Sequence, residues 1–377
     1  MRNTWIELDL EILRDNLRSI RNALKAGTEI IFVVKSNAYS HGVVPVARCA
    51  WECNVKWFAV AHMDEALTLR EFLPGANILV MGVLSREDVG LAIDRNITPI
   101  VVSEKHALML SAEARARNAT LGCHAKIDTG MGRLGFLWNK ATDSLQWMAA
   151  EAGGLSIQGM CMHFASAAGT PDNFADVQWK RFCDVISACE KRGILVSFKH
   201  VSNSAAFLAH PEWDVDGVRP GILLYGYGHD SELSKGKTTD KRNIKTRPFL
   251  QWKTKVVQVK KVPRGFRVGY YSTYTTESET HIATIDVGYA DGYSRLLSNN
   301  GHVLIGGRRV PVVGRVTMNF VTVDIGKQAE AKEGDDVVLI GQQGMEAIWA
   351  DEMAEWCKTI PYEILTNIRT DDHRLIR

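Results

Sequence analysis

The most constraining feature of this chain is a regular alternation of strand-like and helix-like segments over its first 225 residues. Short apolar runs have the length of buried strands, and the segments between them repeat apolar residues at helical spacing, as at Leu13, Leu17 and Ile20. Eight strands alternating with helices is the count of a (β/α)8, TIM-like barrel, an α/β fold. The predicted strands are 30–35, 57–61, 78–82, 98–103, 122–127, 157–163, 195–201 and 218–225.

The pattern changes after a polar stretch at 229–247, which we interpret as a domain junction. Short β-like runs separated by Gly, Asn and Pro then predict a small, mainly β domain, either a partly closed barrel or a sandwich. We therefore expect residues 10–235 to form the barrel and 236–377, with a first strand inside 1–9, to form the C-terminal β domain. The predicted β runs are 253–260, 281–287, 302–305, 310–313, 320–325 and 337–340, followed by a helix over 349–360.

Composition excludes several classes of function. The formal net charge of the 377 residues is only +2, and no segment concentrates basic and aromatic residues, so we expect no nucleic-acid partner. Seven scattered cysteines without a Cys-x-x-Cys pair indicate reduced thiols in a cytoplasmic protein, and neither they nor the histidines have the spacing of a metal site. No secretory signal or membrane-spanning apolar run is present.

Polar residues collect at the predicted C-terminal strand ends, where barrel active sites lie. Lys35 follows the first strand, and a lysine in apolar surroundings can become a base or nucleophile through a lowered pKa. Taken singly, each of these residues also has a plainer role: Lys35 as a strand-end lysine, His163 as a core histidine and Ser204 as a helix cap. The other members of this rim set are Tyr39, Lys126, Asp128, Arg133, Asn203, Arg219 and Gly221.

The rim set also suggests a cofactor. Small residues around Ser204 and Gly221 leave backbone amides open to a phosphate, as in many barrels near the last two strands. A phosphate site, an isolated lysine and an imidazole together suggest pyridoxal phosphate. The Gly-x-Gly-x-x-Gly run at 130–135 lacks the strand-to-helix context of a dinucleotide site, so we do not expect one.

Ordered motifs along nearly the whole chain resemble the bacterial alanine racemases. Residues 34–42 (VKSNAYSHG) are similar to the family's pyridoxal-phosphate attachment motif, and 126–135 (KIDTGMGRLG) to its second block. Further matching motifs are MHFA at 162–165, NSAA at 203–206, VRPGI at 218–222, GY at 269–270, GYADG at 288–292 and GRVTM at 314–318.

The resemblance implies a two-base racemisation. Lys35 would hold the cofactor as a Schiff base and act as base on one face of Cα, while Tyr270 of a second subunit acts on the other, which makes a homodimer with shared sites. Nearby cations, His163 and Arg219, would lower the pKa of Tyr270. Arg219 would face the pyridine nitrogen without donating a proton.

The remaining implied roles concern binding. The cofactor phosphate would be held by Tyr39, Ser204, Gly221 and Ile222, with Asn203 and His163 also at the cofactor. The carboxylate of a small amino-acid substrate would be bound by Arg133 and Met318, with Asn319 beside it. Lys126 matches a family position that is often carbamylated, and its added charge would orient Arg133.

The chain departs from the family near its C-terminus. Asn319 stands where aspartate is usual, and no tyrosine follows Tyr362, so Asn367 or Thr370 must occupy the place of a tyrosine that closes the pocket. A hydrogen-bonding group there would admit a hydroxymethyl side chain. This pattern resembles the serine racemases of vancomycin resistance.

Two broader expectations follow from this second resemblance. The first is racemisation of serine as well as alanine for peptidoglycan precursors, and the second is fusion to a membrane domain, with which the abrupt start at the strand 5–8 would agree. The alternatives are an alanine-only racemase and a non-catalytic pyridoxal-phosphate-binding barrel. A barrel decarboxylase of basic amino acids is disfavoured, because it needs an acidic partner for the ring nitrogen where this chain has Arg219.

Overall fold

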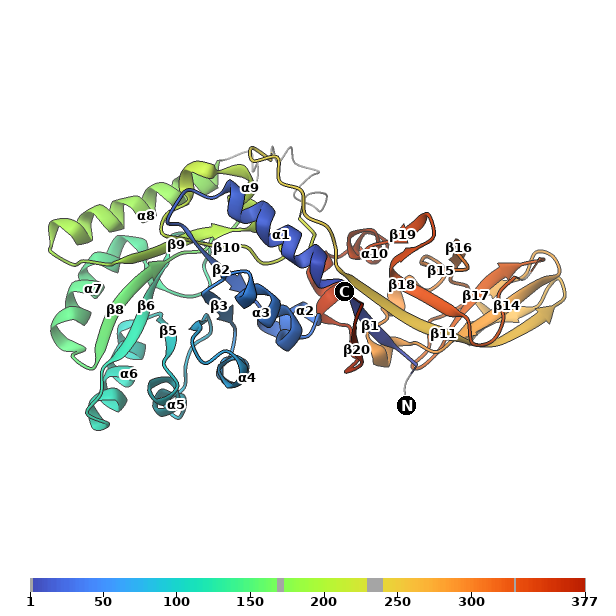
Figure 1. Ribbon diagram of the computed structural model, residues 1–377, viewed down its shortest axis with the longest axis horizontal. Helices are drawn as coiled ribbons and strands as arrows, with labels where there is room; N and C mark the ends of the chain where they lie inside the picture. The colour runs from blue at the N-terminus through green and yellow to red at the C-terminus, as the bar shows by residue number, and fades with distance from the viewer. Residues whose placement is uncertain (1–2, 168–172, 229–239, 329, 377) are drawn as a thin grey trace. The chain divides into compact units, whose positions relative to one another are not determined.

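The computed structural model describes residues 3–167, 173–228, 240–328 and 330–376 (Figure 1). Its contacts divide the chain into two compact units. The barrel unit comprises 14–38 and 43–246, and the β unit comprises 1–13, 39–42 and 247–377. The boundary predicted between 235 and 236 lies outside the described residues. None of the described helices is both long and apolar enough to cross a membrane.

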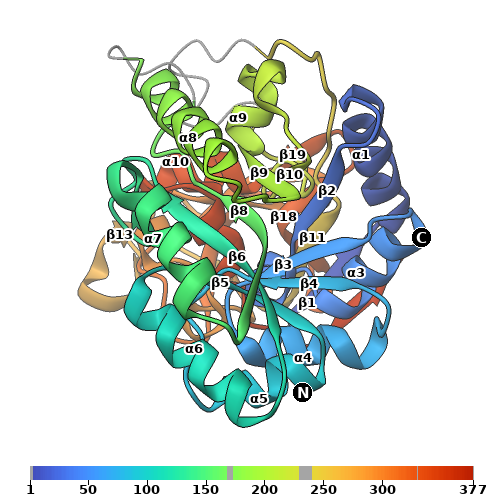
Figure 2. The ribbon, with the colours of Figure 1, turned by 90° about the vertical axis from the view of Figure 1, so that its left-hand side faces the viewer.

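The barrel unit is a closed ring of eight parallel strands, which confirms the predicted fold class. Figure 2 shows the helices around this ring. The ring closes because β5 pairs with β6 while β2 pairs with both β3 and β10. Buried Phe32 and Phe58 belong to its core. The ring strands are β2 (Glu29–Val33), β3 (Trp57–Val60), β4 (Asn77–Val80), β5 (Ile97–Val101), β6 (Leu121–Asp128), β8 (Leu155–Cys161), β9 (Phe198–Asn203) and β10 (Gly217–Arg219), and the two-residue β7 (Phe136–Leu137) pairs with β6.

Helices connect successive strands of the ring, which is what places all the strand C-termini at one end. Capping side chains fix the start of some of these helices; Ser103, for example, accepts a hydrogen bond from the backbone amide of His106. The helices are α1 (Leu10–Ala23), α3 (Val43–Glu52), α4 (Met63–Phe72), α5 (Asp88–Asp94), α6 (Glu104–Ala116), α7 (Trp138–Glu151), α8 (Phe174–Lys191) and α9 (Ser204–Ala209), with a short 3-10 turn at Pro211–Trp213.

All eight predicted barrel strands differ in their bounds from the observed ones, and two of the differences have a clear local origin. The eighth was expected over 218–225, but β10 ends at Arg219 because Pro220 has no amide hydrogen to donate and the following residues form turns, with the amide of Leu224 bonded to the carbonyl of Gly221. The seventh was expected from residue 195, but β9 begins at Phe198, and Leu195 is exposed.

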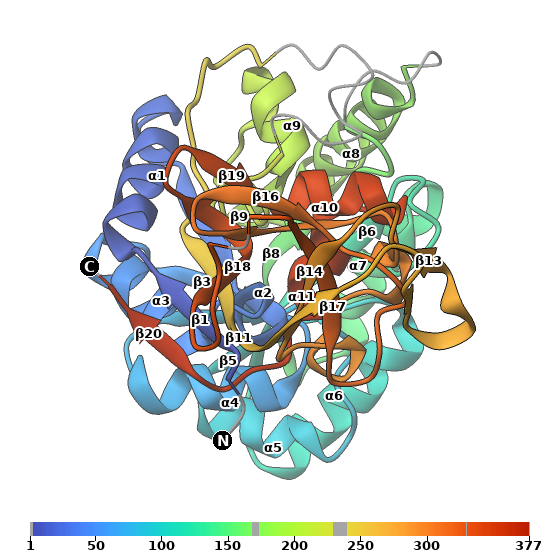
Figure 3. The ribbon, with the colours of Figure 1, turned by 90° about the vertical axis from the view of Figure 1, so that its right-hand side faces the viewer.

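The β unit is built on one branched sheet, shown in Figure 3. The long strand β11 (Leu250–Val262) pairs with β1 (Trp5–Leu8) and β18 (Asp336–Gln343) along its first half and with β14 (Thr280–Ile285) along its second. The other elements are β12 (Arg267–Val268), β13 (Tyr274–Thr275), β15 (His302–Ile305), β16 (Arg308–Pro311), β17 (Val321–Gly326), β19 (Glu346–Ile348), β20 (His373–Leu375), α10 (Ala350–Cys357) and α11 (Pro361–Thr366).

The helix predicted over 349–360 is α10, which ends earlier because Lys358 adopts a left-handed conformation and Pro361 begins α11. Short 3-10 turns occupy Tyr289–Asp291 and Arg295–Leu297, whereas the turn at Tyr270–Ser272 has positive φ at Tyr271 and Ser272.

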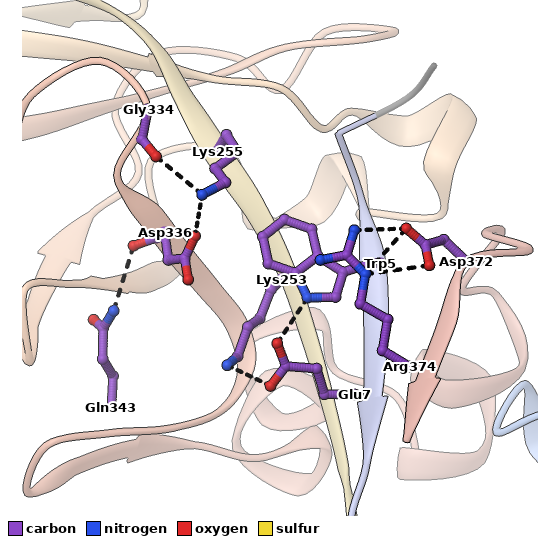
Figure 4. Close-up of polar contacts among 9 residues, drawn as sticks. All are labelled: Trp5, Glu7, Lys253, Lys255, Gly334, Asp336, Gln343, Asp372 and Arg374. Carbon is purple, nitrogen blue, oxygen red and sulfur yellow. Dashed lines mark hydrogen bonds and ion pairs between the residues drawn. The ribbon is translucent and has the colours of Figure 1, made fainter. Parts of the chain in front are cut away.

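The first strand of the chain is fixed in this sheet by side chains as well as by its ladder (Figure 4). Glu7 on β1 accepts hydrogen bonds from Lys253 on β11 at 2.6 Å and from the indole of Trp5 at 2.8 Å. The guanidinium of Arg374 on β20 lies 4.4 Å from the centre of the Trp5 ring. These contacts link the two ends of the chain within the β unit.

Candidate active site

A cavity of about 260 Å³ opens where the barrel strands end. Basic and imidazole side chains line it together with apolar ones, and none of the described residues in its wall carries a carboxylate. Such a lining favours an anionic ligand. The structure thereby brings together half of the predicted rim set, namely Lys35, Lys126, Arg133, His163 and Arg219, and adds the imidazoles of His62 and His200.

Lys35 reaches this cavity from the end of β2. Burial lowers the pKa of its ammonium, the positive charge of Arg133 lowers it further, and the negative charge of Glu65 acts in the opposite direction. A lysine in this condition is more readily deprotonated than an exposed one, as a base or nucleophile requires.

The backbone after Lys35 makes a left-handed turn. The segment labelled α2 (Lys35–Tyr39) is not a right-handed helix, because five consecutive residues that are not glycine have φ between 49° and 62°. Such backbone costs roughly 1–2 kcal/mol per residue, so the turn stores about 5–10 kcal/mol. Three hydrogen bonds hold it: Ala38 N to the Val34 carbonyl, Val43 N to the Asn37 side chain, and Ser36 N to Glu65.

Arg219 at the end of β10 is buried, and several hydrogen-bond acceptors surround its guanidinium group. Its guanidinium donates to the backbone carbonyls of Met162, His200 and Val201 at 2.6–2.9 Å and to Nδ1 of His200 at 2.8 Å. Desolvation lowers its pKa. An arginine nonetheless keeps its charge in proteins, so Arg219 supplies a fixed cation and no proton.

His163 follows the sixth ring strand, and its imidazole lines the cavity. Burial and the charges of Arg219, Lys126, Arg133 and Lys35 lower its pKa to about 3. A pKa this low favours the neutral imidazole, which can accept or donate a hydrogen bond. The role of His163 as a cation that lowers the pKa of Tyr270 stays a prediction from the sequence.

The predicted phosphate residues of the barrel lie together. Ser204 Oγ accepts hydrogen bonds from the amides of Gly221 at 3.0 Å and Leu223 at 3.2 Å. Asn203 is occupied as the cap of α9, since its side chain accepts from the amide of Ala206. The Ser204 hydroxyl hydrogen remains to be donated to a ligand, so the group fits a phosphate cradle.

The loop after β6 carries Lys126, Asp128 and Arg133. Asp128 Oδ1 accepts from the amides of Gly130 and Gly132, so this carboxylate shapes the loop that carries Arg133. Lys126 is buried and donates to a backbone carbonyl, and burial, together with the nearby guanidinium groups of Arg219 and Arg133, lowers its pKa to about 8.

The other predicted site residues belong to the β unit. Tyr270 and Met318 are 68% and 55% exposed. Asn319 is exposed beside Met318, and its amide lies close to Gly288. Tyr39 is buried, with its ring edge-on to Tyr362.

The two candidates for the altered C-terminal position differ in their surroundings within the β unit. Thr370 donates its hydroxyl to the Thr4 carbonyl at 2.9 Å. Asn367 is exposed at the end of α11, and its backbone carbonyl lies so close to Gly292 that a Cβ there would collide with it.

Sequence reasoning missed three polar groups near the cavity, of which Gln178 and His200 are fully buried. Glu65 contacts the turn after Lys35, and Gln178 on α8 bonds to residues that follow β6 and β8. His200 links Arg219 to His124, whose Nδ1 lies 2.9 Å from Nε2 of His200. Glu65 alone had a sequence signal, because it stands three residues after the N-cap His62.

Two family models match the chain in order. The model described as alanine racemase, N-terminal domain, matches residues 8–229, and that described as alanine racemase, C-terminal domain, matches 249–376. A curated alanine racemase from Desulforamulus reducens is 40% identical over 361 residues, which are 96% of this chain and 95% of the relative.

Solved structures agree in fold over the whole length. The alanine racemase from Bacillus anthracis with bound L-Ala-P has a TM-score of 0.90 and 35% identity, and the match covers 100% of this chain and 96% of that one. The alanine racemase from Bartonella henselae with covalently bound pyridoxal phosphate has a TM-score of 0.85 and 25% identity, with 100% and 99% covered.

Proposed function

The chain belongs to the alanine racemase family, and from this membership and the cavity around Lys35 we propose that it interconverts L- and D-alanine with pyridoxal phosphate as cofactor. The observation that carries the proposal is the meeting of Lys35 and Arg219 in one cavity of a chain matched along both of its domains. The match to the C-terminal model disfavours a non-catalytic barrel, because a cofactor carrier has no need of the domain with Tyr270.

The barrel residues fit this cofactor. Lys35 would bind it covalently, Ser204 with the amides near Gly221 and Ile222 would hold its phosphate, and the fixed cation of Arg219 suits a ring nitrogen that is not protonated. Pyridoxal phosphate, when bound, withdraws electrons from Cα of an amino acid and so acidifies its hydrogen.

Racemisation then requires two proton-transfer groups on opposite faces of Cα. Lys35 suits one role, because burial and the charge of Arg133 lower its pKa and so favour the uncharged amine. Tyr270 of a second subunit is proposed for the other. Arg133 and the backbone of Met318 would bind the substrate carboxylate.

Activity assays of purified protein test this proposal. Wild-type protein should racemise both L- and D-alanine, Lys35→Ala and Tyr270→Phe should lose at least about 100-fold in kcat, and the surface variant Lys56→Ala should match wild type. A Lys35→Ala variant with full activity would refute the mechanism, and wild-type protein without racemase activity would refute the function.

A homodimer with shared sites is supported by the surface of the β unit. Exposed Tyr271 and Phe320 accompany exposed Tyr270 and Met318, and the amide of Ala290 bonds to the Met318 carbonyl, which brings neighbouring loops together. Exposed apolar groups of this kind favour a protein partner. Mixing the inactive Lys35→Ala and Tyr270→Ala subunits should restore part of the activity, and sedimentation should give twice the 42.0 kDa chain mass. A monomer at assay concentration would contradict it.

Lys126 is proposed to be carbamylated. With a pKa of about 8, a sizeable fraction of its amine is uncharged at neutral pH, and that amine can attack CO₂ and release a proton to form a carbamate. The product anion would face Arg133, whose charge contributes to the low pKa of Lys126. A carbon-13 signal from labelled bicarbonate, absent in Lys126→Ala, would support the modification, and equal signals in both would contradict it.

Serine is proposed as a second substrate. The enzyme would then produce D-serine as well as D-alanine, and both would supply peptidoglycan precursors. The support is the absence of any tyrosine after Tyr362 in the sequence and the hydrogen-bonding side chains at Asn367 and Thr370. The ratio of kcat/KM for L-serine to that for L-alanine should fall in Asn367→Tyr or Thr370→Tyr. A wild-type ratio below about 10⁻³ would instead favour the alanine-only alternative. Roles in vancomycin resistance and a fused membrane domain stay predictions from resemblance.

A further inference from the structure

Glu65 on α4 joins the loop at the end of β3 to the peptide bond that follows Lys35. Its Oε2 accepts hydrogen bonds from the amides of Ala61 at 2.8 Å and His62 at 3.2 Å, and the second of these closes a capping box at the start of α4. Its Oε1 accepts from the amide of Ser36 at 2.5 Å. A capping glutamate needs only the bond to its own helix, so the bond to Ser36 requires another explanation.

The amide of Ser36 is the first of the left-handed turn. It belongs to the peptide bond between Lys35 and Ser36, and Ser36 begins the five residues with positive φ. Since such backbone persists only where its surroundings fix it, the bond to Glu65 determines how the chain leaves Lys35. The direction of the Lys35 Cα–Cβ bond follows from that backbone.

The carboxylate also acts on Lys35 through its charge. Lys35 shares the cavity wall with His62, Lys126, Arg133, His163 and Arg219, and among the charged groups with a resolved effect on Lys35, Arg133 favours the neutral amine and Glu65 the ammonium. Glu65 is half-buried, so its charge is incompletely screened by solvent.

We propose that Glu65 is a positioning residue for Lys35: its carboxylate anchors the left-handed turn at Ser36 and so aims the lysine, and its charge offsets that of Arg133. The inference rests on the proposed function, in which Lys35 binds pyridoxal phosphate. It assigns no contact between Glu65 and substrate or cofactor.

The test uses the full chain stripped of cofactor and three variants. Glu65→Gln keeps the shape and removes the charge, Glu65→Asp keeps the charge and shortens the reach, and Glu104→Gln is the control, because Glu104 also lies in the first turn of a barrel helix and accepts a side-chain hydrogen bond. Three properties are measured. On the stripped protein these are the pKa of Lys35, from the pH dependence of its chemical labelling read by mass spectrometry, and the rate constant for covalent incorporation of pyridoxal phosphate. On protein reloaded with pyridoxal phosphate, kcat and KM for L-alanine are measured.

Removing the charge should lower the pKa of Lys35 by about 0.5–1 in Glu65→Gln, with no change in Glu65→Asp beyond about 0.3. Incorporation should slow about tenfold or more in both, and kcat should fall while KM stays within about twofold. Glu104→Gln should match wild type in all three. Glu65→Gln that keeps the pKa and the incorporation rate of wild type would overturn the proposal, whereas wild-type protein that fails to bind pyridoxal phosphate would overturn the proposed function instead.

Discussion

The buried amide of Gln178 supports a sharp prediction, because it bonds to two of the strand ends that carry the cavity. Its Oε1 accepts from the amide of Ala165 at 2.9 Å, and its Nε2 donates to Oγ1 of Thr129 at 3.2 Å and to the carbonyl of His163 at 3.3 Å. The side chain is fully buried. Gln178→Glu preserves the shape and replaces the donor by an oxygen that faces the His163 carbonyl.

The cost of this change depends on pH. A carboxylate at this point loses one hydrogen bond, meets a carbonyl oxygen and is buried, which together cost about 3–5 kcal/mol of unfolding free energy. A protonated carboxyl can donate to the carbonyl, so the folded state raises the pKa of the new group above its unfolded value of about 4.3. The loss of unfolding free energy relative to wild type is therefore small below about pH 4.3. It grows by about 1.4 kcal/mol per pH unit until the pH passes the pKa that the new carboxyl has in the folded state.

Thermal unfolding between pH 5 and pH 8 measures this dependence. The gap in melting temperature between Gln178→Glu and wild type should widen with rising pH, while Gln178→Leu should be destabilised by a similar amount at every pH. The surface variant Gln158→Glu should stay near wild type, because Gln158 is exposed. A Gln178→Glu deficit that is constant across this range would refute the reasoning.

Three further changes have expected outcomes. Gly135→Ala should destabilise the fold by about 2–4 kcal/mol, since φ is +123° and the new Cβ would lie 2.6 Å from a carbonyl oxygen, whereas Gly132→Ala, in open space, should lose only about 1 kcal/mol in thermal unfolding. Asp214→Ala should lower the free energy of unfolding by about 3–5 kcal/mol in denaturant titration, because it removes the carboxylate that pairs with the buried guanidinium of Arg242. Ser204→Ala should weaken binding of pyridoxal phosphate about tenfold in equilibrium dialysis.

The sequence predicts the barrel well because each ring strand is a separate apolar run. A strand in the closed ring is buried on both of its faces, so its residues are apolar in an unbroken run that is easily recognised in the sequence. Strand ends are less well predicted, since they depend on single groups such as the missing amide hydrogen of Pro220 after β10. The collection of Lys35, Lys126 and Arg219 in one cavity follows from topology alone, because parallel strands place their C-termini together.

The state of the site residues is a different matter, because it depends on neighbours distant in sequence. His163 looks like a cation candidate in the sequence, yet burial and the charges of four surrounding cations lower its pKa. Gln178 lies within an ordinary helical pattern, and nothing in that pattern shows that its amide faces Thr129 and His163. Such contacts join segments that are far apart in the sequence, and the local spacing of residues does not show that these segments lie together.

The left-handed turn after Lys35 shows how fold and chemistry depend on each other. Its five residues include no glycine, and Asn37 is the only type among them that tolerates this backbone readily, so local preference opposes the structure. The turn exists because contacts elsewhere in the barrel unit outweigh that preference, with Glu65 at its start and the bond from Val43 to Asn37 near its middle. If this turn took up an ordinary right-handed backbone, we would expect the ring of strands to remain and the Lys35 side chain to point in another direction. The strained turn therefore places the amine of Lys35, and the favourable contacts of the rest of the barrel offset the free energy of the strain.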